Sequence, residues 1–281
     1  MNLLPVPKNE IRNFIENLDE LPYPDLSIFD NRHFLKPFDG KVYRFGQVEM
    51  SRGCPFSCTY CINKFTQQLY KGKGKYHREK SIKRVVEELK YLKEKYNLTA
   101  LRFLDETFLT MKIDTLRDFF RLYKENVFLP FLIATRPETV DEDRVQLLKE
   151  AGCVNASIGI ESGDEDCRRK VLQRFMTDEC IINAFFAFKR RGIRVSSFNM
   201  LGLPYETREG VFKTIKLNKK CGANSCTISF FYPFEGTVLK DLCLKEGYID
   251  NKFQTVNLEE DSILDMPHVI DQNYCYPNPS G

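Results

Sequence analysis

The amino-acid sequence predicts an α/β fold built on a parallel sheet. Three observations predict it: short apolar runs from about residue 45 onward, charged amphipathic stretches between them, and glycines just after several of those stretches. Alternating runs of this kind are typical of parallel strands that are joined by right-handed helical crossovers. An open doubly wound sheet and an incomplete barrel both satisfy the pattern. In either architecture the chemistry belongs at the carboxyl ends of the strands.

The predicted strands are short and apolar enough to suit a parallel sheet that helices cover. They are residues 46–51, 100–104, 131–135, 155–160, 195–200 and 226–231. Amphipathic helices are predicted between them, at residues 81–96, 141–150, 178–191 and 207–221. Ser81 and Asp141 are good N-caps for the first two of these helices. Gly152, Gly192 and Gly222 follow three of the helices, where a left-handed residue is favoured.

Composition and charge argue against a membrane protein, a secreted protein and a nucleic-acid-binding protein. Of the 281 residues, 42% are hydrophobic and 29% are charged, as in ordinary folded proteins. The sequence has no signal-peptide pattern and no run of roughly 18 apolar residues, so we expect a cytoplasmic protein without a membrane partner. A formal net charge of +3 makes no case for nucleic acid as a partner. The basic residues between 71 and 84 could meet RNA phosphates, but we expect a solvated loop and helix face.

The most informative segment follows the first predicted strand and reads RGCPFSCTYC over residues 52–61. Cys54, Cys58 and Cys61 have the spacing C-x-x-x-C-x-x-C, which can bind three irons of a cubane iron–sulfur cluster. Such clusters normally take four thiolates, so the fourth iron would have no protein ligand. An open iron can bind a substrate or cofactor, as other catalytic metals do.

A structural zinc site and buried free thiols are the alternative interpretations of these cysteines. Zinc sites usually take four ligands in two spaced pairs, and no second pair is present. The histidines are scattered, at His33, His77 and His268. An auxiliary cluster would need a compact second set of cysteines. The other cysteines are dispersed along the chain, at Cys153, Cys167, Cys180, Cys221, Cys226, Cys243 and Cys275.

The cysteine segment resembles the signature of the radical S-adenosylmethionine (SAM) superfamily. The resemblance implies that the three cysteines hold a 4Fe–4S cluster whose fourth iron is chelated by the amino and carboxylate groups of SAM. It implies that one electron cleaves SAM to methionine and a 5′-deoxyadenosyl radical. An external electron donor of the flavodoxin or ferredoxin type is implied as a partner. The implied fold, a partial TIM-type barrel of six β/α units, agrees with the predicted strands.

The same resemblance implies SAM contacts at the ends of several strands. Tyr60 would lie near the adenine, and Asp105 or Glu106 near the SAM amino group, although the family's Gly-Gly-Glu glycines are absent here. Glu161 or Ser162 would lie near the ribose and methionine. An acid at the end of an apolar strand is costly unless it is paired or functional. The alternatives are a helix-dipole role for the acid pair at 105–106 and a structural ion pair for Glu161.

Two further positions match the family pattern. Arg174 matches an arginine that pairs with the SAM carboxylate, with Arg168 and Arg169 as competitors and a surface arginine as the alternative. Gly202 begins the Gly-Leu-Pro-Tyr-Glu-Thr stretch at 202–207, which would close on the adenine. The alternative for that stretch is a turn and helix start, which its Pro and Thr also explain.

The pattern over residues 45–245 most resembles members that carry an upstream cobalamin-binding domain. The sequences LDELPYPD at 18–25 and TRPE at 135–138 favour this subgroup. No Asp-x-His-x-x-Gly loop occurs, so cobalamin would reach this core through a missing upstream domain. We interpret residues 1–40 as an extended lead-in or linker, 41–250 as the radical SAM core, and 251–281 as a C-terminal extension, for which a truncated end and a naturally short chain are the two alternatives.

The sequence therefore predicts a radical SAM enzyme that abstracts hydrogen from an organic substrate or, with cobalamin, methylates it. It does not identify the substrate, nor any residue that would act on it. A tRNA-modifying methylthiotransferase of the same superfamily is an alternative, and it would need an extra cluster domain and a nucleic-acid module. A non-catalytic binding module stabilised by zinc or a cluster is the alternative from another class.

Overall fold

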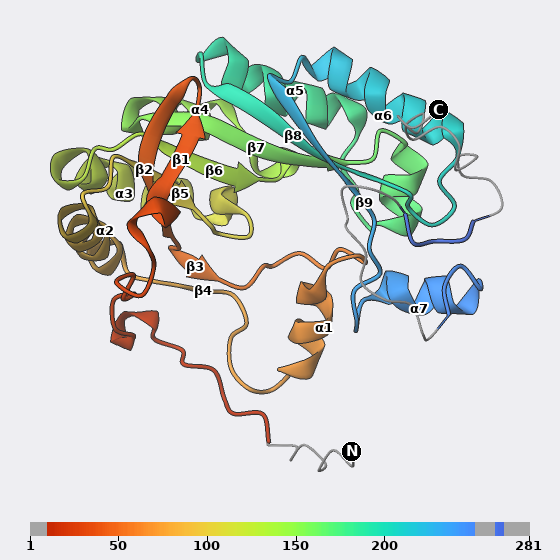
Figure 1. Cartoon of the computed structure of the whole chain (residues 1–281), viewed down its shortest axis with the longest axis horizontal. Coiled ribbons are helices and arrows are strands. Elements are labelled where there is room, and N and C mark those ends of the chain that lie inside the picture. The colour runs from red at the N-terminus through yellow and green to blue at the C-terminus, as the bar shows by residue number, and fades with distance from the viewer. Residues whose placement is uncertain (1–9, 251–261, 267–281) are drawn as a thin grey trace.

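A curled seven-stranded sheet forms the centre of the computed structural model, which describes residues 10–250 and 262–266 (Figure 1). In spatial order the strands are β1 (Leu35–Phe38), β2 (Lys41–Val48), β5 (Ala100–Phe103), β6 (Phe131–Thr135), β7 (Cys153–Glu161), β8 (Arg194–Leu201) and β9 (Ser225–Phe230). From β2 to β9 all neighbours pair in parallel, whereas β1 pairs antiparallel with β2. The predicted partial barrel of β/α units is confirmed.

The first predicted strand is displaced from the observed one. β2 ends at Val48, whereas the prediction ran over residues 46–51. The chain leaves the sheet there because the backbone N–H groups of Met50 and Ser51 donate hydrogen bonds to the Asp105 carboxylate instead of to a neighbouring strand. The sequence gives no sign of this long-range contact, so the apolar run alone set the predicted boundary.

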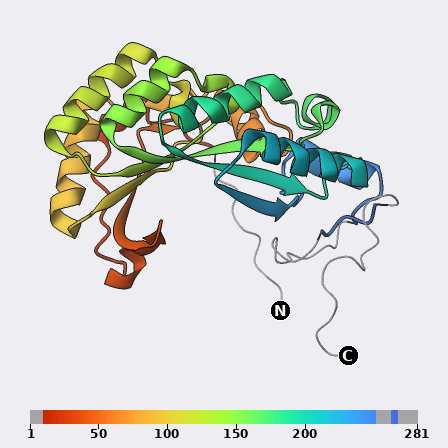
Figure 2. The ribbon, with the colours of Figure 1, turned by 90° about the horizontal axis from the view of Figure 1, so that it is seen from above.

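Five helices cover the convex face of the sheet in one row (Figure 2). They are α2 (Ile82–Tyr96), α3 (Ile113–Asn126), α4 (Glu142–Ala151), α5 (Asp178–Arg190) and α6 (Arg208–Cys221). Side chains of Ser81 and Asp141 accept the capping hydrogen bonds that the sequence predicted, and Gly152 is left-handed. Helix α3 was not predicted, because Lys112 offers no side-chain cap and Val127 follows its end.

The main hydrophobic core lies between this helical row and the sheet. Phe131 of β6 lies in an aromatic cluster, with ring centroids 5.4 Å from Phe103 and Tyr123 and 5.9 Å from Phe120. Fully burying one such ring contributes about 1.5–3 kcal/mol. The densely packed core holds the strands rigidly, and therefore also the loops at their carboxyl ends.

Two short helices, α1 (Ile62–Leu69) and α7 (Val238–Lys245), lie on the other side of the sheet from α5 and α6 (Figure 1). A second hydrophobic cluster fixes α7 against the loops after β7, β8 and β9. Its buried residues are Leu172, Leu203, Phe231, Leu239, Cys243, Ile249 and Leu264. A two-stranded ribbon of β3 (Ser51–Arg52) and β4 (Arg78–Glu79) flanks α1. None of the described helices is long and apolar enough to cross a membrane.

The described part of the lead-in, residues 10–34, packs on α2. Leu18, in the 3-10 turn η1 (Leu18–Glu20), is 1% exposed, and Asp19 accepts a hydrogen bond from the N–H of Ser81 at 2.8 Å. The N–H of Leu26 donates to the Tyr96 hydroxyl at 2.9 Å. A second 3-10 turn, η2 (Asn31–Phe34), leads into β1. The boundary at residue 40 therefore stays a prediction.

The basic cluster at residues 71–84 is only partly the solvated face that we expected. Lys80 is buried, and its ammonium group pairs with Glu88 at 3.0 Å. The guanidinium groups of Arg78 and Arg84 lie over aromatic rings of the N-terminal segment and donate to backbone carbonyls there. Arg78 and Arg84 thus hold the lead-in against the core, and the expectation of solvation is wrong for these two residues and for Lys80.

Candidate active site

The cysteine loop, residues 53–61, runs from β3 to α1. Gly53 has φ +84°, and a Cβ atom there would lie 2.6 Å from the carbonyl oxygen of Tyr76, so only glycine fits. From α1, the Gln67 side-chain amide donates to the carbonyl oxygens of Cys54 at 2.7 Å and Phe56 at 3.1 Å. The backbone of the loop is therefore fixed by the helix that follows it.

The middle of the loop is attached to the opposite wall of the site. The Thr59 hydroxyl donates to the carbonyl of Val171, in the π-helical turn η5 (Cys167–Val171), at 2.5 Å. The Thr59 N–H donates to the Leu172 carbonyl, and the Thr59 carbonyl accepts from the N–H of Leu239 in α7. The loop thus closes the space between the carboxyl ends of the strands and helix α7.

The three thiols sit on this fixed loop. Cys54 and Cys58 are buried and Cys61 is half-buried. The Cys58 sulfur accepts a hydrogen bond from Nη1 of Arg136 at 2.9 Å, and the Cys61 sulfur accepts one from Nδ2 of Asn63 at 3.4 Å. Donors aimed at sulfur stabilise the thiolate form, which is the form that binds metals.

The thiols are close enough to influence one another. Burial raises the pKa of Cys54 and Cys61, and the charges of Cys58 and Glu106 add to the rise. Within residues 10–250 and 262–266, no three His, Cys, Asp or Glu side chains converge closely enough to hold a single metal ion. A cubane cluster spaces its thiolates more widely, because each binds a different iron. Three thiols on one fixed loop, with N–H donors aimed at two of the sulfurs, are a donor set of the chemical type that iron–sulfur clusters use.

Three of the predicted SAM contacts lie together: Tyr60 in the cysteine loop, Glu161 at the end of β7, and Arg174 shortly after η5. Nη1 of Arg174 donates to the Tyr60 hydroxyl at 3.0 Å and to Oε1 of Glu161 at 3.3 Å. Its Nη2 donates to the Gly159 carbonyl at 2.6 Å, and the Tyr60 hydroxyl donates to Glu161 at 3.2 Å. The expected ion pair of Glu161 thus exists, with Arg174 as its partner. The competitor Arg168 is buried elsewhere, against Asp178.

The backbone at Glu161 is strained. Its φ is +67°, an unusual value for a residue other than glycine, and it follows a register shift where β7 pairs with β8. Burial raises the pKa of Glu161, and the charge of Arg174 opposes that rise. Strained residues persist where the surrounding structure imposes them, and they cluster at functional sites.

The adjacent acids after β5 have different surroundings. The Asp105 carboxylate is buried and accepts from the N–H of Ser51 at 2.7 Å and from its hydroxyl at 2.6 Å. Burial raises the pKa of Asp105 against these hydrogen bonds. Glu106 is exposed, and its charge reaches the thiols of Cys54 and Cys61. Asp105 thus holds the backbone just before the cysteine loop, whereas the carboxylate of Glu106 is free of such backbone hydrogen bonds among the described residues.

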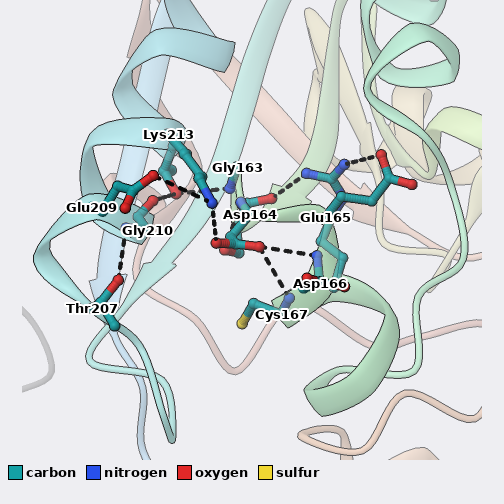
Figure 3. Close-up of polar contacts among 12 residues, drawn as sticks. Gly163, Asp164, Glu165, Asp166, Cys167, Thr207, Glu209, Gly210 and Lys213 are labelled. Atoms are coloured by element: carbon teal, nitrogen blue, oxygen red, sulfur yellow. Dashed lines mark hydrogen bonds and ion pairs between the residues drawn. The ribbon is translucent and has the colours of Figure 1, made fainter.

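The turn after β7 is held by a polar network with α6 (Figure 3). Asp164 accepts from the N–H of Asp166 and from the Lys213 ammonium group, both at 2.9 Å. The Gly163 N–H donates to the Thr214 hydroxyl at 2.7 Å. Ser162, a predicted SAM contact, is fully buried, and its hydroxyl accepts from the N–H of Asp164 at 3.2 Å.

A buried acid that the sequence analysis did not single out lies in the loop after β8. Glu206 accepts through Oε2 from the N–H groups of Gly202 at 2.7 Å and Leu203 at 3.4 Å, and Gly202 is left-handed at φ +72°. Oε1 of Glu206 is buried without a hydrogen-bond partner among the described residues. Glu206 and Ser162 both line a cavity of about 560 Å³. The sequence signal for this acid was Gly202, because a tight turn there leaves backbone N–H groups that need a hydrogen-bond acceptor.

Glu206→Gln is expected to flatten the pH dependence of folding stability. Burial raises the pKa of Glu206 to about 7, against a usual value of 4.5. The folded protein therefore gains stability from the protonated acid below about pH 4.5 and loses it as the pH rises through 7. The loss amounts to about 3 kcal/mol. Urea unfolding at pH 5 and pH 8 measures it. Equal pH dependence in the wild type and the variant would contradict the assignment.

Two residues that contact the cysteine loop were also missed as site residues. Arg136 was noticed only as part of a subgroup pattern, yet its guanidinium group contacts the Cys58 sulfur. Gln67 gave no signal, because a glutamine on an amphipathic helix is ordinary. Loop-to-helix contacts of this kind depend on tertiary packing and carry no local sequence pattern.

Comparison with known proteins identifies the class. The model of the radical SAM superfamily matches residues 48–217, which is more than half of the chain. The chain therefore belongs to the radical SAM superfamily and is an enzyme of that superfamily. Use of SAM and a 4Fe–4S cluster is a general feature of its members.

The sequences of two curated relatives align with most of the chain. An uncharacterized methyltransferase of Pyrococcus horikoshii is 29% identical over 254 residues, covering 90% of this chain and 52% of the relative. The cytidylyl-2-hydroxyethylphosphonate methyltransferase of Streptomyces wedmorensis is 25% identical over 271 residues, covering 90% and 49%. The chain spans about half the length of these relatives.

Solved structures confirm the fold. The radical SAM methyltransferase TsrM of Kitasatospora setae, determined with cobalamin and a [4Fe-4S] cluster bound, superposes with a TM-score of 0.61 at 20% identity, covering 72% of this chain and 40% of TsrM. The cobalamin-dependent SAM radical enzyme OxsB, determined with aqua-cobalamin and SAM bound, gives 0.51 at 18% identity, covering 61% and 26%.

Proposed function

We propose that this chain is the SAM-cleaving core of a radical methyltransferase. The observation that carries the proposal is the juxtaposition of three thiols on one fixed loop with the Tyr60, Glu161 and Arg174 trio. When bound, the cluster supplies an electron and SAM supplies the 5′-deoxyadenosyl radical that abstracts hydrogen. The residues of the chain bind and orient SAM beside Cys54, Cys58 and Cys61.

Several of the predicted SAM contacts have surroundings that support a role in binding SAM. Arg174 is buried and carries a fixed guanidinium group, which suits pairing with the SAM carboxylate. Both hydrogen bonds that the described residues donate to the Glu161 carboxylate end on Oε1, so Oε2 can accept from a ribose hydroxyl. Glu106 is exposed and could accept a hydrogen bond from the SAM amino group. The Gly202 turn and the ring of Tyr60 would lie near the adenine.

The net reaction that we infer is methyl transfer with the help of cobalamin. Both curated relatives described above are named as methyltransferases, and TsrM and OxsB were determined with cobalamin bound. The matched segments make up about half of those relatives, and we infer that a domain other than the radical SAM core would hold the cobalamin. An external donor of the flavodoxin or ferredoxin type would supply the electron. The organic substrate is not identified by these observations.

The proposal predicts a change in the cluster's spectrum when SAM binds. Anaerobically reconstituted and reduced protein should give a 4Fe–4S electron paramagnetic resonance signal that shifts when SAM is added, because SAM ligates the open iron. S-adenosylhomocysteine, which lacks the sulfonium methyl group and its positive charge, is the matched ligand for comparison. If the cluster is intact and reduced but its signal does not change at saturating SAM, the proposal is contradicted.

A further inference from the structure

Arg136 is the cation that touches a cysteine of the loop. It follows the last residue of β6 and is only 7% exposed. Its Nη1 atom donates to the Cys58 sulfur at 2.9 Å, over a sequence separation of 78 residues. The end of a central strand thus carries a positive charge directly to a sulfur of the loop.

Glu138 and the ring of Phe56 also contact the Arg136 guanidinium group and fix its orientation. Nε donates to Oε1 of Glu138 at 2.8 Å, and Nη2 donates to the same oxygen. Cζ lies 3.8 Å from the ring centroid of Phe56, which belongs to the cysteine loop. Because Nε and Nη2 of Arg136 donate to Glu138, the Nη1 atom of Arg136 is the one that faces the Cys58 sulfur. Glu138 is part of the 3-10 turn η4 (Pro137–Thr139), so the whole pair is supported by backbone.

We propose that Arg136 is a positioning residue that sets the reduction potential of the cluster, and that Glu138 moderates its effect. The inference rests on the proposed function, since it requires a cluster at Cys54, Cys58 and Cys61. Reduction adds one negative charge to the sulfur-bound cluster. Hydrogen bonds to cluster sulfurs and nearby charge shift cluster potentials, and such effects are strong where water is excluded.

The Arg136–Glu138 pair predicts shifts of opposite sign. Removing the guanidinium charge in Arg136→Gln destabilises the reduced cluster, so its potential falls. Removing the carboxylate in Glu138→Gln leaves the cation uncompensated beside Cys58, so the potential rises. A residue that merely shaped the loop would change cluster content, and would not move the potential in opposite directions with these two substitutions.

The test is a redox titration of the reconstituted chain in the absence of SAM. Electron paramagnetic resonance measures the reduced cluster at each potential. Arg136→Gln should lower the reduced-to-oxidised ratio at fixed potential about tenfold, which is about 59 mV for a one-electron couple. Glu138→Gln should raise the potential, and Arg136→Lys should fall between the wild type and Arg136→Gln. Arg117→Gln is the matched control, because Arg117 pairs with Asp114 on the exposed face of α3.

The outcomes separate this inference from the proposed function. Potentials in Arg136→Gln and Glu138→Gln that equal the wild-type value would overturn the role of Arg136 and leave the proposed function intact. If Arg136→Gln fails to hold a cluster, Glu138→Gln decides alone: a raised potential supports the inference, and an unchanged or lowered one overturns it. A wild-type chain that takes up no four-iron cluster would overturn both.

Discussion

Replacing Cys54, Cys58 and Cys61 together by alanine is expected to reduce the iron bound after anaerobic reconstitution from about four per chain to background. The reason is that these thiols are the ones fixed on the loop between β3 and α1, with N–H donors aimed at two of the sulfurs. Iron and sulfide analysis, together with the optical spectrum, measures the change. Circular dichroism establishes that the variant is folded.

A matched control removes three thiols that lie outside the loop. Cys167, Cys180 and Cys226 are not fully buried, so their replacement by alanine should disturb the core little. This control should retain the full iron content. Retention of the cluster by the loop variant, or its loss from the control alone, would show that the assigned ligands are wrong. Cys275 lies outside the described residues and is left unchanged in both.

Glu161→Gln is expected to weaken SAM binding about ten- to hundredfold while the iron content stays normal. The glutamine keeps the shape of the side chain but loses the charge that both Arg174 and a bound ribose would use. Stability should fall as well, because breaking a buried ion pair from one side typically costs about 3–5 kcal/mol. Equilibrium binding of SAM and thermal unfolding measure the two effects separately.

Glu88→Gln provides the control for that experiment. Glu88 also pairs with a buried cation, Lys80, at 3.0 Å, but it lies on α2 away from the cysteine loop. Glu88→Gln should therefore lower the melting temperature without changing SAM affinity. If Glu161→Gln behaves in the same way, the carboxylate at 161 has a structural role only and its proposed contact with SAM is refuted.

Much of the sheet could be predicted from sequence, because its strands are apolar and its helices are amphipathic. The run over residues 131–135 coincides with β6. The caps at Ser81 and Asp141 also correspond to the helix starts. What escaped prediction depends on distant partners. The antiparallel strand β1 was placed in a linker, because Lys36 and Pro37 obscure its pattern.

The candidate site was predictable where a short motif carries the chemistry. The spacing of the cysteines identified the loop, and the resemblance selected Tyr60, Glu161 and Arg174, which the fold brings together from separate elements. The sequence could not show that the side chains of Asp105 and Ser162 accept hydrogen bonds from backbone N–H groups of Ser51 and Asp164. The Asp105 bond joins segments 54 residues apart, whose distance is set by the packing of the barrel, whereas the Ser162 bond lies within the turn after β7.

The most direct measurement of the central claim is the release of 5′-deoxyadenosine. Reconstituted protein that has been reduced with dithionite should convert SAM to 5′-deoxyadenosine and methionine, even slowly without substrate, and the Cys54, Cys58 and Cys61 triple alanine variant should not. Mass spectrometry detects the nucleoside. A folded wild-type chain with an intact, reduced four-iron cluster that releases no 5′-deoxyadenosine would contradict the account.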